Sequence, residues 1–395
     1  MNATFAPSRA AAWARLQEFV PRAGRAYQRD RNFDPAPQDR YNVSMLSPYL
    51  RHRLLGEWEV LAEVLAHHSK NDAFKFVQEV YWRTYFKGWL EQHPQVWGDY
   101  LDARYTARSD LSGSQAQLYE QAINAATGIE PLDAWAQELI KTGYLHNHAR
   151  MRFASLWIFT LQLPWTLGAD FFYRHLLDGD PASNTLSWRW VAGLHTPGKT
   201  YLATPGNLAK YAQRFAQTQA YEAVFASSAK PVADTPNPPL EDLVLPDRTQ
   251  IEPNTALLLH EDDLHLQWSF APAATAALAV TNIDIDRQVS QFRTSAVNDT
   301  LDRAPGNKCM EQLTADTLLD WLHEVGTTRL AIPYIPIGHA RTAFEPVRQL
   351  LIQHSIQINW LVRDHDRDTW PFATSGFFKV GKQIPAFLKK AGLID

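Results

Sequence analysis

The sequence predicts a multi-domain α and α/β protein, with an all-α domain at residues 1–225 and an α/β domain with a parallel sheet at residues 256–395. The first prediction rests on apolar residues that recur three and four positions apart between residues 9 and 217. The second rests on short apolar runs that alternate with helical stretches after residue 256. Residues 226–255 are rich in Pro, Asp, Asn and Thr, which is typical of a linker. A chain of 395 residues is also long enough for two cores.

Helical periodicity in the first half is clearest in three segments, LLGEWEVLAEVLAHH (54–68), DAFKFVQEVYWRTYFKGWLEQH (72–93) and PLDAWAQELIKTGYLHNHARMRFASLWIFTLQL (131–163). Breaks fall at NFDPAPQDR (32–40), ARSDLSGSQ (107–115) and TPGKTYLATPGN (196–207). We therefore expect a bundle of many helices.

In the second half, strands are expected in the apolar runs at 256–261, 276–283, 329–337 and 356–362. Helices are expected at TADTLLDWLHEV (314–325) and AFEPVRQLLIQH (343–354). Strands that alternate with helices predict a parallel sheet. The usual glycine-rich phosphate loops, GxGxxG and GxxxxGK[ST], are missing from the sequence.

The composition, 45% hydrophobic and 20% charged, is typical of a soluble protein. There is no run of about 18 apolar residues and no apolar signal segment at the start, so we expect a cytoplasmic protein without membrane contact. The single Cys309 excludes a disulfide framework, a cysteine-ligated zinc site and a four-thiolate iron–sulfur cluster. His146 and His148 stand two residues apart, which points them to different faces of a helix, so no metal site is expected.

Charge does not by itself indicate a nucleic-acid binder. The net charge is −4, with 23 Lys+Arg against 21 Asp+Glu in residues 1–225 and 15 against 21 in residues 226–395. Neither balance predicts a basic face, so only a local patch would attract phosphate.

Residues 142–191 interleave bulky aromatic residues with charged and amide side chains, which a core excludes unless something polar is bound there. Four motifs follow in order, Asn147-His148-Ala149-Arg150-Met151, Asp178-Gly179-Asp180, Ser183-Asn184 and Trp188-Arg189-Trp190. Together they resemble the FAD-binding helical domain of the photolyase and cryptochrome family, and the resemblance runs from about residue 5 to residue 217. It implies a blue-light flavoprotein with FAD as its chromophore.

The second half bears a weaker resemblance to the antenna domain of the same family. LLLHEDDLHL (257–266) is similar to that domain's opening strand, and residues 349–390 are similar to its closing helix, strand and phenylalanine-containing exit. That domain comes first in most members, whereas here it follows the flavin domain. The resemblance leaves room for a second, antenna chromophore of unknown identity. The alternative is an unrelated α/β domain fused to a flavin module.

For the cofactor, Val43 to Leu50 resemble the family signature Thr-Ser-x-Leu-Ser-Pro-Tyr-Leu, with one hydroxyl missing at Val43. Taken alone, Ser44 also fits a helix N-cap. The resemblance implies that Asp178 pairs with Arg150 and that Asp180 accepts a hydrogen bond from the flavin imide. The alternative is an exposed turn at residues 178–180. The full set of FAD contacts that the resemblance implies is Tyr27, Ser44, Met45, Leu46, Ser47, Arg83, Asn147, Arg150, Asp178, Asp180 and Asn184.

Asn184 matches the position that faces flavin N5. A carboxylate there can supply a proton, whereas an amide stabilises the reduced anionic flavin that repair needs. Asn184 therefore favours a photolyase over a plant-type photoreceptor.

Glu79 and Trp82 are predicted to contact the DNA lesion. Their i, i+3 spacing puts them on one face of a helix. The resemblance implies that Trp82 stacks on a flipped pyrimidine dimer and that Glu79 hydrogen-bonds it; alternatively, Trp82 is core and Glu79 solvated. Asn147 and Met151 stand where enzymes of the family that act on (6-4) photoproducts have histidines, so a cyclobutane dimer is expected. His148 replaces the arginine usual in those dimer enzymes.

Electron transfer is implied for Trp188 and Trp165, which match the first two members of the family's tryptophan chain. Most tryptophans are packing residues. The third member is not evident, because residues 105–115 lack the tryptophan expected there. The candidate substitutes are Trp97, Tyr100 and Tyr105.

The expected function is light-driven DNA repair by a photolyase, a carbon–carbon lyase that transfers an electron from photoexcited reduced FAD to a cyclobutane pyrimidine dimer. The alternatives are a cryptochrome-like photoreceptor without repair activity and a flavin-binding structural or redox module. DNA that contains pyrimidine dimers is the expected partner. No pattern indicates an oligomeric state, or a preference for single- or double-stranded DNA.

Overall fold

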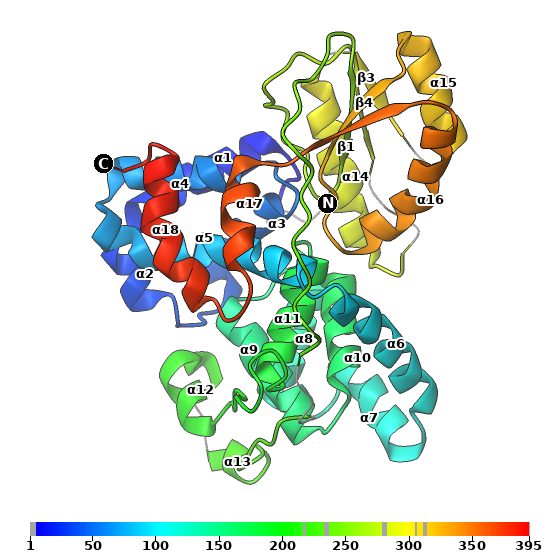
Figure 1. The fold of residues 1–395 in the computed structure, drawn as a ribbon. Coiled ribbons are helices and arrows are strands. Elements are labelled where there is room, and N and C mark those ends of the chain that lie inside the picture. The colour runs from blue at the N-terminus through cyan, green and yellow to red at the C-terminus, as the bar shows by residue number, and fades with distance from the viewer. Residues whose placement is uncertain are drawn as a thin grey trace.

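The computed structural model describes residues 5–215, 219–232, 237–278, 283–304, 306–310 and 314–394. The first part is helical (Figure 1). Its elements are α1 (Arg9–Phe19), η1 (Val20–Arg22), α2 (Arg25–Asp30), η2 (Pro37–Asp39), α3 (Ser47–Arg51), α4 (Glu57–His67), α5 (Lys70–Glu91), α6 (Gln95–Asp110), α7 (Gly113–Ile123), α8 (Glu130–Thr142), α9 (Asn147–Ser155), the π-helical turn η3 (Leu156–Thr160), α10 (Trp165–His175), α11 (Pro181–Val191), α12 (Pro205–Tyr211), η4 (Gln213–Phe215) and α13 (Gln219–Glu222). None of the described helices is both long and apolar enough to cross a membrane.

Local signals fix where the central helices begin and end. The 22-residue α5 begins after Ser69, whose side chain accepts from the backbone N–H of Asp72. α11 begins after its N-cap residue Asp180, whose side chain accepts a hydrogen bond from Ser183 N, and it has a proline in its first turn. α8 ends at Gly143, which has a φ of 65°, and Leu177 leaves no space for a Cβ there. α5 packs against α2, α4 and α11, and α10 packs against α6 and α11, which gives the predicted bundle.

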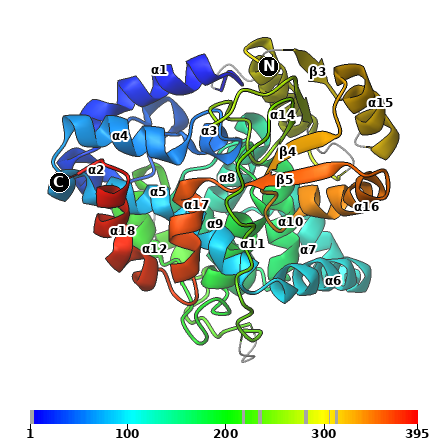
Figure 2. The ribbon, with the colours of Figure 1, turned by 45° about the horizontal axis from the view of Figure 1, so that its top comes forward.

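The described part of residues 226–255 contains neither helix nor strand, as expected of a linker. It runs from the lower helices to the sheet in Figures 1 and 2. Two backbone hydrogen bonds hold it to the helical part, from Val232 N to Ala192 O and from Glu241 N to Gln92 O.

The second part is a five-stranded parallel sheet in the order β3-β2-β1-β4-β5. Its elements are β1 (Ala256–His260), β2 (Thr275–Leu278), α14 (Arg287–Asp302), β3 (Asn307–Cys309), α15 (Ala315–Val325), β4 (Arg329–Pro333), α16 (His339–Gln353) and β5 (Gln357–Leu361). The α/β prediction is therefore confirmed. β1, β4 and β5 fall within predicted runs, and β2 begins one residue before the run at 276–283. Residues 279–282 of that run lie outside the described residues. β3 and α14 were not predicted.

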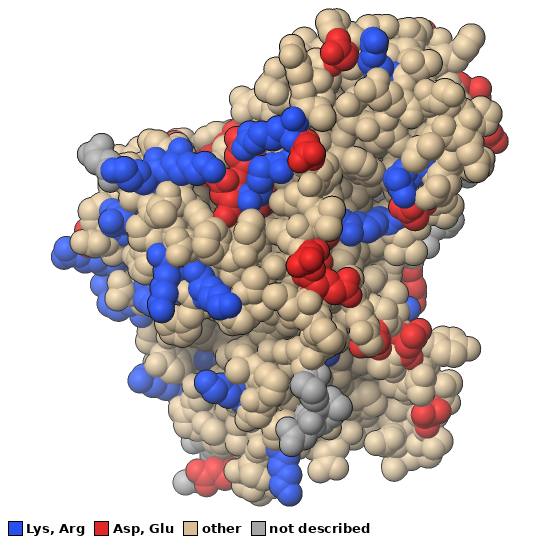
Figure 3. All heavy atoms as spheres, viewed as in Figure 1, with Lys and Arg blue, Asp and Glu red and all other residues tan. Residues whose placement is uncertain are grey.

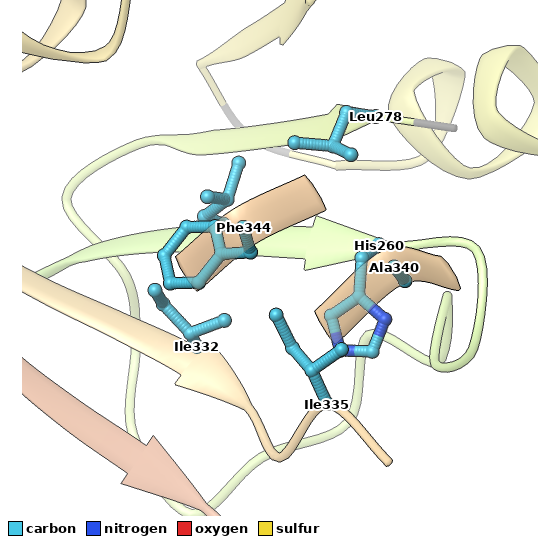
Figure 4. Close-up of a pocket in the computed structure, with 7 residues that line it drawn as sticks. His260, Leu278, Ile332, Ile335, Ala340 and Phe344 are labelled. Atoms are coloured by element: carbon cyan, nitrogen blue, oxygen red, sulfur yellow. The ribbon is translucent and has the colours of Figure 1, made fainter. Parts of the chain in front are cut away.

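One small cavity lies between the sheet and α16 (Figure 4). His260, Ile332, Ile335 and Phe344 enclose only about 10 Å³, room for about one water molecule. The sheet core is therefore filled by the chain's own side chains.

The chain then returns to the helical part through α17 (Asp364–Thr369), η5 (Trp370–Phe372) and α18 (Phe378–Lys390). Both views place α17 and α18 beside α5 rather than on the sheet (Figures 1 and 2). Phe387 contacts Tyr81 of α5 at a ring-centroid distance of 5.9 Å. Gly88 lies against the Trp370 ring, which leaves no room for a Cβ. The division at 1–225, 226–255 and 256–395 stays a proposal, and its sheet-bearing part is 256–361.

Candidate cofactor and substrate cavity

A cavity of about 460 Å³ opens within the helical part. α5, α9, α11 and the segment before α3 supply most of its wall. Of the residues predicted for cofactor and lesion, the cavity is lined by Tyr27, Ser44, Met45, Leu46, Ser47, Glu79, Trp82, Arg83, Asn147, Arg150, Asp178, Asn184 and Trp188. Trp165 and Asp180 are not among the residues that line it. Met151 and His148, named above for substrate choice, also line it, as do Arg31 and Trp190, to which no sequence motif gave a role.

The segment before α3 contributes hydroxyl groups from a strained backbone. Met45 has a φ of 51°, a left-handed conformation that is uncommon for a residue with a side chain. Ser44 Oγ accepts a hydrogen bond from Leu46 N at 3.4 Å. α3 has only five residues, so its N-terminus is too short to count as a polar site of its own. The polar groups of this wall are therefore the serine hydroxyls.

The predicted Arg150–Asp178 pair is present. Arg150 Nη2 donates to Asp178 Oδ2 at 2.9 Å, and Arg150 Nε donates to Leu145 O at 2.8 Å. Burial by itself raises the pKa of Asp178, but Arg150 and Arg83 outweigh it, so the pKa lies below the ordinary value. Asp178 is therefore ionised and fixed beside the cavity.

Asp180 is 1% exposed and lies at the start of α11. Its Oδ1 accepts from Ser183 N at 2.6 Å, while its Oδ2 lies 3.6 Å from both Lys87 Nζ and Arg83 Nη1. Burial acts to raise its pKa, yet Lys87, Arg83 and Arg51 together lower it. The exposed-turn alternative for residues 178–180 is thus wrong, since both carboxylates are buried.

Asn184 and Trp188 stand one turn apart on α11. Asn184 Nδ2 donates to Ala169 O at 2.8 Å, which fixes the amide at the cavity wall. The Trp188 ring packs against Gly168 of α10, where a Cβ would lie 2.3 Å from the indole. A glycine at 168 is therefore what lets α10 approach this ring.

The cavity is also lined by Glu79 and Trp82, which lie on one face of α5, as their spacing predicted. Glu79 lies 3.7 Å from Arg31, and 37% of its side chain is exposed. Burial raises the pKa of Glu79, although Arg31 opposes the shift. Trp82 stacks on Phe377 with a centroid distance of 4.0 Å and an interplanar angle of 9°.

His146 and His148 lie close together, with ring centroids 5.7 Å apart. Within the described ranges there is no group of three His, Cys, Asp or Glu side chains that could hold a metal ion. His146 Nδ1 accepts from His148 N at 3.2 Å. Burial lowers the pKa of His148 to about 4, so it is neutral at physiological pH.

Two series of aromatic rings run through the α6–α11 region. Trp188 contacts Trp157 at 6.3 Å, and Trp157 contacts Tyr119 at 6.0 Å. Trp165 contacts Tyr100 at 5.7 Å, and Tyr100 contacts Trp97 at 5.5 Å. The first series begins at the cavity wall, whereas the second contains Trp165 and two of the suggested substitutes for a third member. Tyr105, the remaining substitute, is 78% exposed.

These contacts give a prediction for photoreduction of bound FAD by an external thiol. Trp188→Phe should remove most of the rate, because phenylalanine is hard to oxidise. Trp157→Phe should slow it more than Trp165→Phe, because Trp157 is the tryptophan in ring contact with Trp188. The measurement is the loss of flavin absorbance under blue light. Equal rates in Trp188→Phe and the parent protein would exclude Trp188 from the relay.

A helical body that encloses a cavity of this size, with aromatic walls and paired buried carboxylates, defines a cofactor-binding protein. Residues 76–234 match the family model described as the FAD binding domain of DNA photolyase.

The chain is 31% identical over 194 residues to a deoxyribodipyrimidine photo-lyase of Agrobacterium fabrum, a match that covers 47% of this chain and 38% of that protein. It is 34% identical over 159 residues to the Streptomyces griseus protein of the same name, which covers 39% and 33%. The chain thus matches about two fifths of the length of these relatives. A crystal structure of a bacterial class III photolyase from Agrobacterium tumefaciens aligns with a TM-score of 0.45 and 25% identity, over 54% of this chain and 44% of that one.

The side chains of the cavity fit FAD. Its volume lies within the range of about 300–1,000 Å³ typical of ligand pockets. On the cavity wall, Asp178 Oδ1 and Arg83 Nη1 are buried, and neither has a hydrogen-bond partner in the described part of the chain. Buried polar atoms of this kind need a partner, and the polar edge of a flavin supplies one. The hydroxyls of Ser44 and Ser47 suit the more polar remainder of the cofactor.

Proposed function

We propose that the protein repairs DNA in light, by electron transfer from reduced, photoexcited FAD to a cyclobutane pyrimidine dimer. One observation carries the proposal: ten of the eleven residues predicted for the cofactor, all but Asp180, line a single cavity together with both residues predicted for the lesion. Donor and acceptor would therefore sit in contact within one enclosure.

Bound FAD would supply one electron and take it back, so that the two carbon–carbon bonds of the cyclobutane ring break without net redox change. The chain's own side chains position the partners. Trp82 lines the cavity and its ring stacks on Phe377, and an extruded dimer would stack on this tryptophan. Glu79 lines the same cavity, where it would hydrogen-bond the dimer, and burial raises the pKa of its carboxyl above the ordinary value.

A basic strip beside Trp82 supports DNA as the partner. α18 begins next to Trp82 through Phe377 and carries four exposed lysines, Lys379, Lys382, Lys389 and Lys390. Residues 369–394 contain no Asp or Glu. Figure 3 shows Lys and Arg gathered over α18 and its neighbours on the left of the face. α18 therefore provides a local patch of positive charge, although the net charge of the whole chain is negative.

Binding of duplex DNA should depend on this strip. Lys379→Gln with Lys382→Gln should weaken binding and reduce the slope of log affinity against log salt by about 2, or about 0.9 for each phosphate that a lysine no longer neutralises. The measurement is fluorescence anisotropy at several salt concentrations. Lys308→Gln, on the sheet-edge strand β3, is the control and should leave the slope unchanged. An unchanged slope in the double variant would remove α18 from the DNA interface.

The test of function is a repair assay on the reduced protein with an oligonucleotide that bears one thymine cyclobutane dimer. Light should restore thymine absorbance, darkness should not, and Glu79→Ala should repair more slowly. Bound and photoreducible flavin without repair would instead favour the cryptochrome-like photoreceptor.

A further inference from the structure

The carboxyl ends of the sheet strands are buried against the helical part. β1 ends at His260, and the next three residues, Glu261, Asp262 and Asp263, are 1%, 6% and 2% exposed. Open α/β sheets bind ligands at this edge, where the strand order reverses. Here the order reverses beside β1, where only about 10 Å³ remains, and arginines from the helical part occupy the edge. The edge therefore serves as a contact between the two parts of the chain.

Asp262 is connected to the flavin-facing turn by two cations. Arg51 Nη1 donates to Asp262 Oδ1 at 2.5 Å, and Arg51 Nε donates to the carbonyl of Gly179 at 2.9 Å. Lys87 Nζ lies 3.7 Å from Asp262 Oδ1 and 3.6 Å from Asp180 Oδ2. Both cations are buried, since the Arg51 and Lys87 side chains are 1% and 4% exposed.

Asp263, the next residue, is connected elsewhere. Its carboxylate accepts from Arg363 at 2.9 Å and from Arg53 at 3.1 Å. Arg53 also donates hydrogen bonds to Glu57 and Asp366. Arg363 also donates hydrogen bonds to the backbone carbonyls of His265 and Gln267. Asp262 and Asp263 are thus adjacent buried carboxylates, each with two cationic partners. Of these two residues, only Asp262 has partners that also contact the turn at 178–180.

We propose that Asp262 is a positioning residue for FAD, which acts through Arg51 and Lys87 on the Asp178–Asp180 turn. Lys87 is shared between Asp262 and Asp180, and it stays 3.6 Å from Asp180 Oδ2. Arg83, which lines the cavity, lies 3.6 Å from the same oxygen, so Asp180 helps to hold a cavity-wall cation in place. Without the charge of Asp262, Lys87 moves onto Asp180 and competes with Arg83 for its carboxylate. Arg51 then keeps only Glu261, at 3.3 Å, as its carboxylate partner, and it holds Gly179 less firmly. The proposal rests on the assignment of this turn to FAD, and it gives the sheet a role in the flavin site.

The experiment compares Asp262→Asn with Asp263→Asn in the full-length protein. Titration of apoprotein with FAD gives the dissociation constant from flavin fluorescence, and the visible spectrum reports on the polar surroundings of the bound ring. We expect about tenfold weaker FAD binding and a shifted spectrum in Asp262→Asn. We expect Asp263→Asn to keep the FAD affinity and the visible spectrum of the parent protein, even if its thermal stability falls by as much as that of Asp262→Asn.

A second variant separates positioning from loss of packing. Lys87→Gln added to Asp262→Asn removes the freed cation and should restore part of the FAD affinity. Parent-like FAD binding in Asp262→Asn, or equal losses in the two single variants, would overturn the proposal while the flavin site stands. A parent protein that binds no FAD would overturn the assignment of the turn, and the proposal with it.

Discussion

Arg53→Gly is expected to lower the free energy of unfolding by about 3 kcal/mol, near the low end of the cost of removing one partner from a buried ion pair. Arg53 Nη2 contacts both carboxylate oxygens of Asp366 at 2.7 Å, while Nε and Nη1 reach Glu57 and Asp263. Arg53 also has a φ of 49°, so glycine relieves a backbone strain of about 1–2 kcal/mol that partly offsets the loss. Chemical denaturation monitored by tryptophan fluorescence measures the change.

The same cluster predicts a pH dependence. Burial acts to raise the pKa values of Asp263 and Glu57, but the arginines outweigh it and lower both. A carboxylate with a lowered pKa stabilises the fold above its unfolded pKa, near about 4, and that stabilisation is lost as the pH falls toward the folded value. The difference between parent and Arg53→Gly should therefore shrink below about pH 4. Arg53→Lys, which keeps the charge without the guanidinium fork, should fall between them. A loss of stability that is constant from pH 7 to pH 3 would contradict the ionic account.

Trp82→Ala is expected to weaken binding of dimer-containing DNA by about tenfold or more, because stacking of a base on an aromatic ring contributes about 1–3 kcal/mol. Trp82 lines the cavity, and Phe377 stacks on its ring. An alanine therefore removes the platform and also leaves Phe377 without its partner. Fluorescence anisotropy in darkness, on the same oligonucleotide with and without the dimer, measures the effect.

Two controls sharpen this prediction. Trp82→Phe keeps a flat ring and should retain most of the preference for damaged DNA. Binding of undamaged DNA should change little in either variant, because phosphate contacts dominate it. An alanine variant with undiminished lesion preference would show that the lesion binds elsewhere.

Sequence reasoning predicted those helices and strands that short-range patterns of apolar residues encode. The 3.6-residue periodicity indicated the helical bundle, and the buried apolar runs indicated four of the strands, with β1 almost fully buried as parallel strands are. β3 was missed because its three residues carry no pattern of their own. The packing of α18 on α5 joins residues about 300 apart in sequence, which no local signal predicts.

The candidate site shows the same limit. Ordered motifs placed Arg150, Asp178, Asn184 and Glu79 at one cavity because each motif lies on an element that the bundle brings together. The ring contact of Trp188 with Trp157 depends on how α10 packs at Gly168, and no motif indicated it. The relay role of Trp165 stays a prediction. The Arg51 and Arg53 clusters pair residues more than 200 positions apart and had no signal in the sequence.

The central claim is that light absorbed by FAD in this cavity drives repair of DNA held in the same cavity. The wavelength dependence of repair tests it most directly, measured on reduced protein with the dimer-bearing oligonucleotide and compared with the absorption spectrum of the bound reduced flavin. We predict that the two spectra coincide. Repair that is equal at all wavelengths and in darkness, or no repair under wavelengths that the flavin absorbs, would contradict the account.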